Sequence, residues 1–182
     1  MSGKKWWVIV LVVAVAALIT FRSVALTPQW RSVESSEGQF RVSLPGEPSK
    51  SDDPATDALD GSKFVSHRLS SALRKRTIFA VTWWENPAQS EKTPDELFAH
   101  FRECDLKVFH GTIARDERLD IQGFPANDLV VFGAKGGFAA ENRLIRVGSR
   151  IYSLWVIGPS DNVDKADARK FFDSFLLIKQ RG

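Results

Sequence analysis

One uninterrupted apolar run near the amino terminus constrains this 182-residue chain more than any other feature. The run extends from Trp6 to Phe21, 16 residues of which only one is polar. As a helix it would cover about 24 Å at ~1.5 Å per residue. Extension to Leu26, with Arg22 reaching toward the headgroups, brings the length to the ~30 Å hydrocarbon core of a bilayer. We therefore expect residues 1–26 to form a single transmembrane anchor.

The flanks of the run predict its orientation. Lys4 and Lys5 precede it, and basic residues remain on the cytoplasmic side of a membrane. Trp6 and Trp7 stand where interfacial aromatic residues are expected, and Phe21 ends the run. The predicted topology is a single-pass protein of the cytoplasmic (inner) membrane, with the remainder of the chain in the periplasm or outside the cell.

A cleaved secretory signal is the alternative interpretation of this segment. Ser23 and Ala25 are small residues placed as in a cleavage site after Ala25. The apolar run is longer than the usual 7–15 residues of a signal core, which favours a retained anchor. Both interpretations export the rest of the chain, and the retained anchor makes the lipid bilayer a partner through the N-terminal helix.

Charge excludes one class of partner. The formal net charge is +3, and Lys4, Lys5 and Arg22 account for it, because residues 1–25 contain no acidic side chain. The rest of the chain has 22 basic and 22 acidic residues, so no nucleic-acid partner is expected. Residues 27–29 read as a linker and residues 30–182 as one domain. A single cysteine, Cys104, excludes an intramolecular disulfide.

The domain is predicted to consist of strands and two helices. Gln39 to Leu44 alternates polar and apolar residues, as a half-buried strand does. Residues 49–60 contain four aspartates and little apolar bulk, which predicts a solvated loop. The other predicted strands are Trp30 to Glu34, Lys63 to Ser70, Thr77 to Trp84, Arg118 to Ile121, Ala126 to Phe132, Phe138 to Val147, Ile151 to Ile157 and Leu176 to Ile178, with Gly148 and Ser149 in a tight hairpin.

Both helices have recognisable starts. Thr93 to Glu96 is a capping box with proline in the first turn. The helix that follows is expected to bury one face, to carry His100 beside that face, and to end at Gly111. The residues predicted to form that face are Leu97, Phe101, Cys104 and Val108. A second helix follows Pro159, with Ala168, Phe171, Phe172 and Phe175 facing inward. This order predicts an α+β fold with an antiparallel sheet covered by helices.

Several segments resemble a known family, the PsbP-like α/β/α sandwich. They are "FRVSLPGEP", which ends at Pro48, "IQGFPANDLVV" at 121–131, "RVGSRIYSLWVIGP" at 146–159 and "FFDSFLL" at 171–177. The family includes the extrinsic subunit of photosystem II and many exported bacterial domains. The resemblance covers residues 30–178 and implies the sandwich fold and, by analogy, an accessory role.

Candidate catalytic chemistry is sparse. His100 and Cys104 are separated by four residues on one helix and could form a thiol–imidazole site or supply two metal ligands. Packing of Cys104 in the core is favoured instead. The acidic residues of 52–60 do not follow a calcium-loop spacing, and Gly133 to Gly137 lacks the spacing of a phosphate loop. We predict no catalytic residue, no bound metal and no cofactor.

Two features could serve binding. Arg74, Lys75 and Arg76 form a small basic tip that could contact acidic headgroups or an acidic partner. Trp83 and Trp84 place rings on opposite faces of one strand, and Trp84 would anchor a partner if it were exposed, although burial is the default.

The leading hypothesis is a non-enzymatic, membrane-anchored accessory subunit that stabilises a larger membrane protein complex, photosynthetic or respiratory. The first alternative is a free exported domain that binds a small ligand or peptide between sheet and helix. The second is an unrecognised hydrolase or thiol enzyme built on His100 and Cys104.

Overall fold

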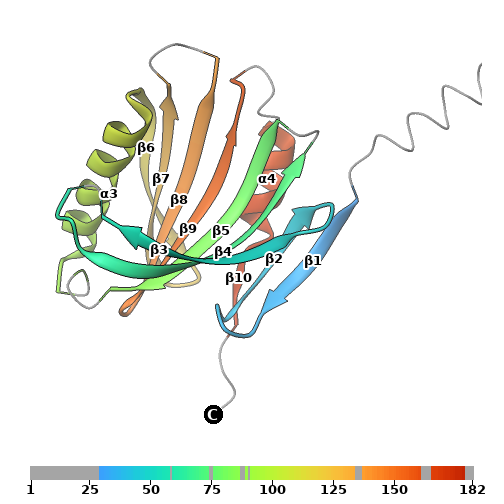
Figure 1. Ribbon diagram of the computed structural model, residues 1–182, viewed down its shortest axis with the longest axis horizontal. Coiled ribbons are helices and arrows are strands. Elements are labelled where there is room, and N and C mark those ends of the chain that lie inside the picture. Colours follow the sequence, from blue (N-terminus) through green and yellow to red (C-terminus); the bar gives the residue numbers. More distant parts are fainter. Residues whose placement is uncertain are drawn as a thin grey trace, which may run out of the picture.

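A seven-stranded antiparallel sheet forms the centre of the domain in the computed structural model (Figure 1). The structure describes residues 29–57, 59–73, 76–86, 89, 91–133, 137–160 and 165–178. In spatial order the strands are β3 (Ser49–Thr56), β4 (Lys63–Leu73), β5 (Thr77–Glu85), β9 (Arg150–Gly158), β8 (Ala139–Val147), β7 (Phe124–Phe132) and β6 (Thr112–Ile121). Gly148, with φ of 61°, makes the predicted tight turn between β8 and β9.

A second, three-stranded sheet joins the two ends of the described chain. β2 (Phe40–Pro45) lies between β1 (Trp30–Ser35) and β10 (Leu176–Leu177), and both neighbours are antiparallel to it. The Ser43 amide also donates to Ser174 Oγ, 131 residues away in sequence. The first and last strands of the domain therefore form one unit.

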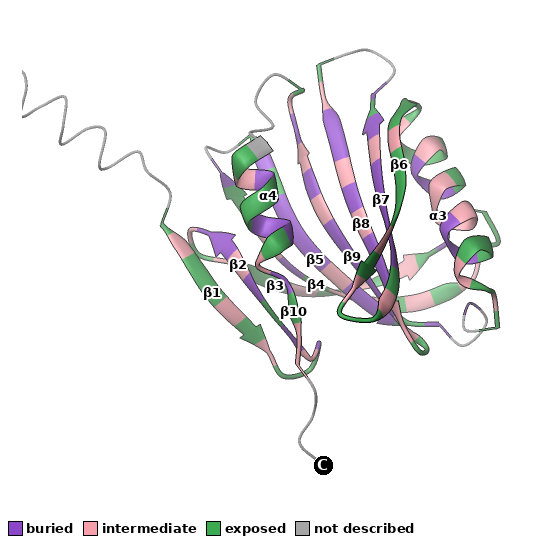
Figure 2. Cartoon of the chain, turned by 180° about the vertical axis from the view of Figure 1, so that it is seen from behind, coloured by how far each residue is buried: buried purple, intermediate pink, exposed green. Residues whose placement is uncertain are grey.

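Two helices cover opposite faces of the large sheet (Figures 1 and 2). Side chains alternate along a strand, so Trp83 and Trp84 point to different faces. Trp83 lies in the core shared with the small sheet and α4 (Lys165–Asp173). Trp84 lies in the core under α3 (Pro94–Phe109). This arrangement is an antiparallel α/β/α sandwich, which confirms the predicted fold class of the domain.

Helix α3 begins and ends for local reasons. Thr93 accepts from the Glu96 amide and the Glu96 carboxylate accepts from the Thr93 amide, which confirms the predicted capping box. His110 ends the helix in the left-handed conformation, with φ of 47°. Gly111 follows because the Phe132 carbonyl oxygen would lie 2.3 Å from a Cβ at that position.

The predicted buried face of α3 was partly wrong. Val108 is 60% exposed, whereas Phe98 and Asp105 are buried with Leu97 and Cys104. The helix therefore turns positions i, i+1, i+7 and i+8 toward the sheet, so that a polar side chain occupies part of its buried face.

The acidic segment after Pro48 forms an edge strand and not a solvated loop. β3 pairs with β4 through eight residues, from Ser49 to Thr56. The segment was mistaken for a loop because its exposed edge is charged and contains Pro54, both of which are tolerated at a sheet edge and discourage pairing with another chain.

Residues 1–28 lie outside the described part of the chain. They include the predicted membrane anchor, residues 1–26, and its boundary with the linker. Among the residues that the structure describes, neither helix has the length and hydropathy needed to cross a bilayer.

Candidate functional site

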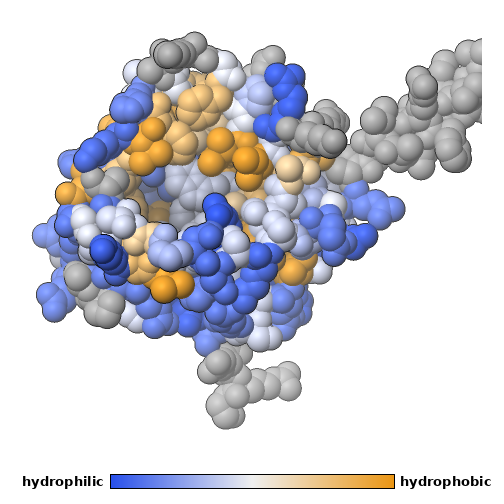
Figure 3. Space-filling view, viewed as in Figure 1, coloured by the Kyte–Doolittle hydropathy of each residue, from blue (hydrophilic) through white to orange (hydrophobic). Residues whose placement is uncertain are grey.

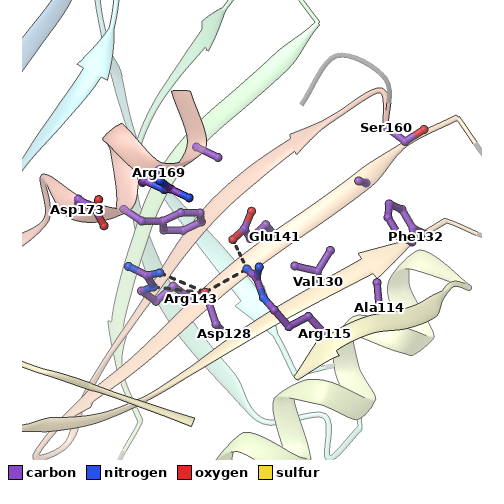
Figure 4. Close-up of a pocket in the computed structure, with 13 residues that line it drawn as sticks. Ala114, Arg115, Asp128, Val130, Phe132, Glu141, Arg143, Ser160, Arg169 and Asp173 are labelled. Atoms are coloured by element: carbon purple, nitrogen blue, oxygen red, sulfur yellow. Dashed lines mark hydrogen bonds and ion pairs between the residues drawn. The ribbon is translucent and has the colours of Figure 1, made fainter. Parts of the chain in front are cut away.

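A cleft of about 670 Å³ lies between α4 and strands β6 to β8 in the part of the chain that the structure describes (Figure 4). We call it the α4 cleft. It is lined by Ala114, Arg115, Asp128, Val130, Phe132, Ala139, Glu141, Arg143, Ser160, Ala168, Arg169, Phe172 and Asp173. Its volume is in the range of sites for small molecules. The cleft exists because α4 has nine residues and covers only part of the sheet face on its side.

A β-bulge determines which side chains of β6 face this cleft. The register of β6 against β7 shifts between Ile113 and Arg115, so that Arg115 lies opposite Val130. Bulges redirect side chains in this way. Ile113 pairs with Val131 and faces α3, whereas Arg115 lines the α4 cleft.

Four charged side chains form a network on the floor of the cleft (Figure 4). Arg143 donates from Nε and Nη2 to the two carboxylate oxygens of Asp128, at 3.2 and 3.1 Å. Arg115 Nη2 donates to Asp128 at 3.2 Å and also to Glu141. The Arg143 guanidinium lies 4.6 Å from the ring centre of Phe172 on α4. The network fixes two guanidinium groups on this face of the sheet.

The network has more donors than acceptors. Asp128 already accepts from both arginines, and burial raises the pKa of Glu141 although Arg115 opposes that effect. The Nε–H of Arg115 is buried and has no hydrogen-bond partner. A buried donor without a partner is uncommon in a folded protein.

A second cluster joins three segments on the α3 side of the sheet. Asp57, just after β3, accepts from His100 Nε2 at 2.7 Å and from Gln89 Nε2 at 3.1 Å. The Cys104 thiol lies 3.7 Å from the other carboxylate oxygen of Asp57. The structure places His100 and Cys104 near one another, an arrangement that their spacing allowed, and adds Asp57, which was assigned to a solvated loop.

The Asp57 carboxylate is ionised despite being buried, with a side chain that is 1% exposed. Burial acts to raise its pKa, but the hydrogen bonds from His100 and from the amides of Leu59 and Asp60 lower the pKa by more. The carboxylate thus stabilises the loop after β3 and attaches it to α3.

The chemistry of the Asp57 cluster favours a structural role. Carboxylate, imidazole and thiol are ligands of Zn²⁺, and these ligand atoms lie within 4.8 Å of one another. However, Lys92 Nζ lies 3.3 Å from His100 Nδ1. Both hydrogen bonds of the imidazole form when Nδ1 accepts from the Lys92 ammonium group and Nε2–H donates to Asp57. A metal on Nε2 would require Nδ1 to carry the proton and face the ammonium group. The thiol contacts a carboxylate, and a carboxylate opposes thiolate formation.

The other candidate residues are dispersed. Trp84 is 5% exposed beneath α3. It is therefore buried, as expected by default, and its side chain offers no surface to a partner. Arg76 is exposed in the turn between β4 and β5, whereas Arg74 and Lys75 lie outside the described residues. Lys4, Lys5, Trp6, Trp7 and Phe21 of the anchor lie outside them as well.

Acidic residues of β3 are used in ion pairs with its neighbour. Asp52 contacts His67 Nδ1 at 2.8 Å, and Glu37 lies 3.3 Å from the same nitrogen. Lys50 binds Glu37, so a protein cation already neutralises this group of potential metal ligands.

Apolar side chains gather in a hollow on the side of the sheet turned away from α4 (Figure 3). Ile78 on β5 shares this face with Trp84 by strand alternation and is 47% exposed. Exposed apolar surface of this kind is typical of protein contacts.

Sequence reasoning missed the charged floor of the α4 cleft, although a signal was present. Asp128, Glu141 and Arg143 occupy positions with the same parity as buried residues in two predicted strands. Charged residues at inward positions of a strand must be paired, and their common parity indicated one face. Arg115 had no such signal, because the bulge that redirects it is not visible in the hydropathy pattern.

Comparisons with known proteins identify the fold. No family model and no curated protein matches the chain. Among solved structures, it is similar to cyanobacterial PsbP (CyanoP) from Synechocystis, with a TM-score of 0.59 and 11% identity over 83% of this chain and 94% of that one. A structure from Bacteroides thetaiotaomicron aligns with a TM-score of 0.44 and 10% identity, over 85% of this chain and 50% of that one. The predicted PsbP-like fold is therefore confirmed.

Proposed function

We propose that this chain is a non-enzymatic accessory domain, held on the outer face of the cytoplasmic membrane by its N-terminal segment, that docks onto a larger membrane protein complex. The single observation that carries the proposal is the PsbP-like fold, which the chain shares with cyanobacterial PsbP over most of both lengths. A shared fold is an argument by analogy, and the surface of this molecule supports it independently.

The surface argument rests on the apolar hollow beside α3. A docking face needs apolar area that water leaves on association. Ile78 is 47% exposed on this face, and Ile113 is exposed on the same face at the β6 end of the sheet. The basic residues that flank the N-terminal segment account for the net charge of the chain, and the domain itself has no net charge. Docking would therefore depend on shape and apolar contact more than on long-range charge.

Purification of the full chain from membranes in mild detergent tests the proposal. We expect the tagged chain to migrate in a native gel with a larger complex, and Ile78→Asp to release it because a carboxylate would be placed in the contact. Leu176→Asp is the matched control, since Leu176 is 46% exposed on β10 of the other sheet. Migration of the wild-type chain alone at its monomer mass would contradict the proposal.

Salt provides a second readout in the same experiment. At about 0.5 M salt, exposed charges separated by more than a few Å are screened, whereas apolar contact is not weakened. We expect the complex to persist at that concentration. Release by salt alone would indicate a charged docking site, such as the basic turn that contains Arg76.

A further inference from the structure

The α4 cleft is divided into a charged part and an apolar part (Figure 4). Arg115, Arg143 and Glu141 lie toward α4, together with Arg169 from the helix. Ala114, Val130 and Phe132 form the other part, where Ser160 stands near the rim. A site with this division suits a ligand that has a polar head and an apolar body.

The charge of the head follows from the groups that face it. Three arginines and three acidic residues line the cleft, so the formal charges of the lining balance. Asp128 is engaged by two arginines, and Glu141 by one, whereas Asp173 is exposed at the helix end. The Arg115 side chain is 39% exposed, and the exposed Arg169 forms no ion pair within the described part of the chain. Donors are therefore in excess at the centre of the cleft, which favours an acceptor with negative charge.

The body of the ligand follows from the remaining wall. Phe132 is 45% exposed although it is a large apolar residue at the end of a strand. Val130 on the same strand and Ala139, opposite Phe132 on β8, continue this surface. A flat apolar group could cover Phe132 and remove its ring from water, at roughly 25 cal/mol per Å² of apolar area.

We propose that the α4 cleft binds a small amphipathic carboxylate, with the carboxylate held by Arg115 and Arg169 and the apolar body packed on Val130 and Phe132. Arg143 is occupied by Asp128 and by the ring of Phe172, so it positions Asp128 and does not contact the ligand directly. This binding activity is independent of the docking proposed above, because the cleft and the apolar hollow lie on opposite faces of the sheet.

Calorimetry with three probes and the full-length chain in detergent tests the chemistry, with a detergent blank subtracted. The probes are 2-naphthoate, its uncharged counterpart 2-naphthamide, and acetate, which has the head without the body. We expect 2-naphthoate to bind at least about tenfold more tightly than either of the others, because it alone uses both parts of the cleft. Equal affinity for naphthoate and naphthamide would overturn the proposal.

Variants locate the site. Arg169→Met should weaken naphthoate binding about fivefold or more without affecting the fold, since Arg169 is exposed and has no ion pair in the described structure. Phe132→Ser should weaken naphthoate and naphthamide alike. Arg31→Met is the matched control, because Arg31 is an exposed arginine that pairs with Glu47 on the other sheet.

Arg115→Lys separates the role of the planar guanidinium from that of the charge. Lysine keeps a positive charge near Asp128 and Glu141 but cannot hold a carboxylate through two parallel N–H groups. We expect this variant to remain folded, as judged by its melting temperature, and to bind naphthoate several-fold more weakly. If Arg169→Met and Arg115→Lys both bind naphthoate as tightly as Arg31→Met does, the ligand does not occupy this cleft and the proposal is wrong.

Discussion

The charged groups on the two faces of the large sheet differ in how completely they are enclosed. Under α3, Asp57 is enclosed by donors from two side chains, two backbone amides and a thiol. Beside α4, Asp128 and Glu141 lie on the floor of a cleft with a guanidinium that is only partly satisfied. Helix α3 has 16 residues and covers the cluster around Asp57. Helix α4 has nine residues and leaves part of its face of the sheet uncovered. The polar groups of the first face therefore hold the fold together, and those of the second are available to a ligand.

Among the variants that test this difference between the two faces, Asp57→Ala is expected to change the free energy of unfolding most. Removal of the carboxylate leaves the imidazole of His100 and two backbone amides without their buried acceptor. We expect the free energy of unfolding to fall by about 3 kcal/mol, as measured by urea denaturation.

Asp53→Ala is the control for this experiment. The Asp53 carboxylate is about half exposed and pairs with Arg68 on the same edge of the sheet. Its removal should cost less than ~1 kcal/mol. Similar losses for the two variants would show that the Asp57 cluster does not anchor α3.

Asp105→Asn tests the same face through pH. Burial raises the pKa of Asp105 to about 7, although Asn142 donates to it at 3.0 Å. The folded state therefore holds a proton that the unfolded chain releases near its ordinary pKa of 3.8, so the contribution of Asp105 to stability is greatest at low pH and is lost as pH rises toward 7. Asparagine carries no such penalty. Relative to wild type, we expect the variant to gain about 2 kcal/mol in stability between pH 5 and pH 8.

Thermal unfolding at the two pH values measures this gain. Glu103→Gln is the control, because Glu103 is exposed on the same helix. Its stability relative to wild type should be the same at both pH values. A constant difference for Asp105→Asn as well would mean that Asp105 is ionised in the folded state at pH 5.

The smallest of these effects is expected from Cys104→Ala. The thiol is buried and donates to Asp57, so its loss should cost about 1 kcal/mol. Migration with the membrane complex should be unchanged, because the thiol has a packing role. Loss of that migration in a variant that is still folded would show that Cys104 contributes to docking and would contradict a role limited to packing.

The structure also shows which parts of this molecule local sequence could predict. The α3 capping box involves residues that are three apart, Thr93 and Glu96, so its pattern is visible in the chain. The partners in the Asp57 cluster are 43 and 47 residues apart, and only the folded sheet brings the loop after β3 beneath α3. The edge strand β3 was missed because its side chains carry the composition of a loop.

The α4 cleft could be predicted only in part. Inward charges at Asp128 and Arg143 were visible in the alternation of two strands, whereas the length of α4 and the bulge before Arg115 determine that these charges face a cleft. Hydropathy patterns describe which side chains are covered, and they do not show where a helix stops short of covering them.

The position of β10 has a consequence for synthesis of the chain. Because β2 takes its outer partner from Leu176 and Leu177, the small sheet cannot be completed until almost the whole domain has left the ribosome. Contacts between such distant residues form late and slowly. In the export that we propose for this chain, the topology would leave the small sheet open until the rest of the domain has passed through the membrane, because β10 is the last strand.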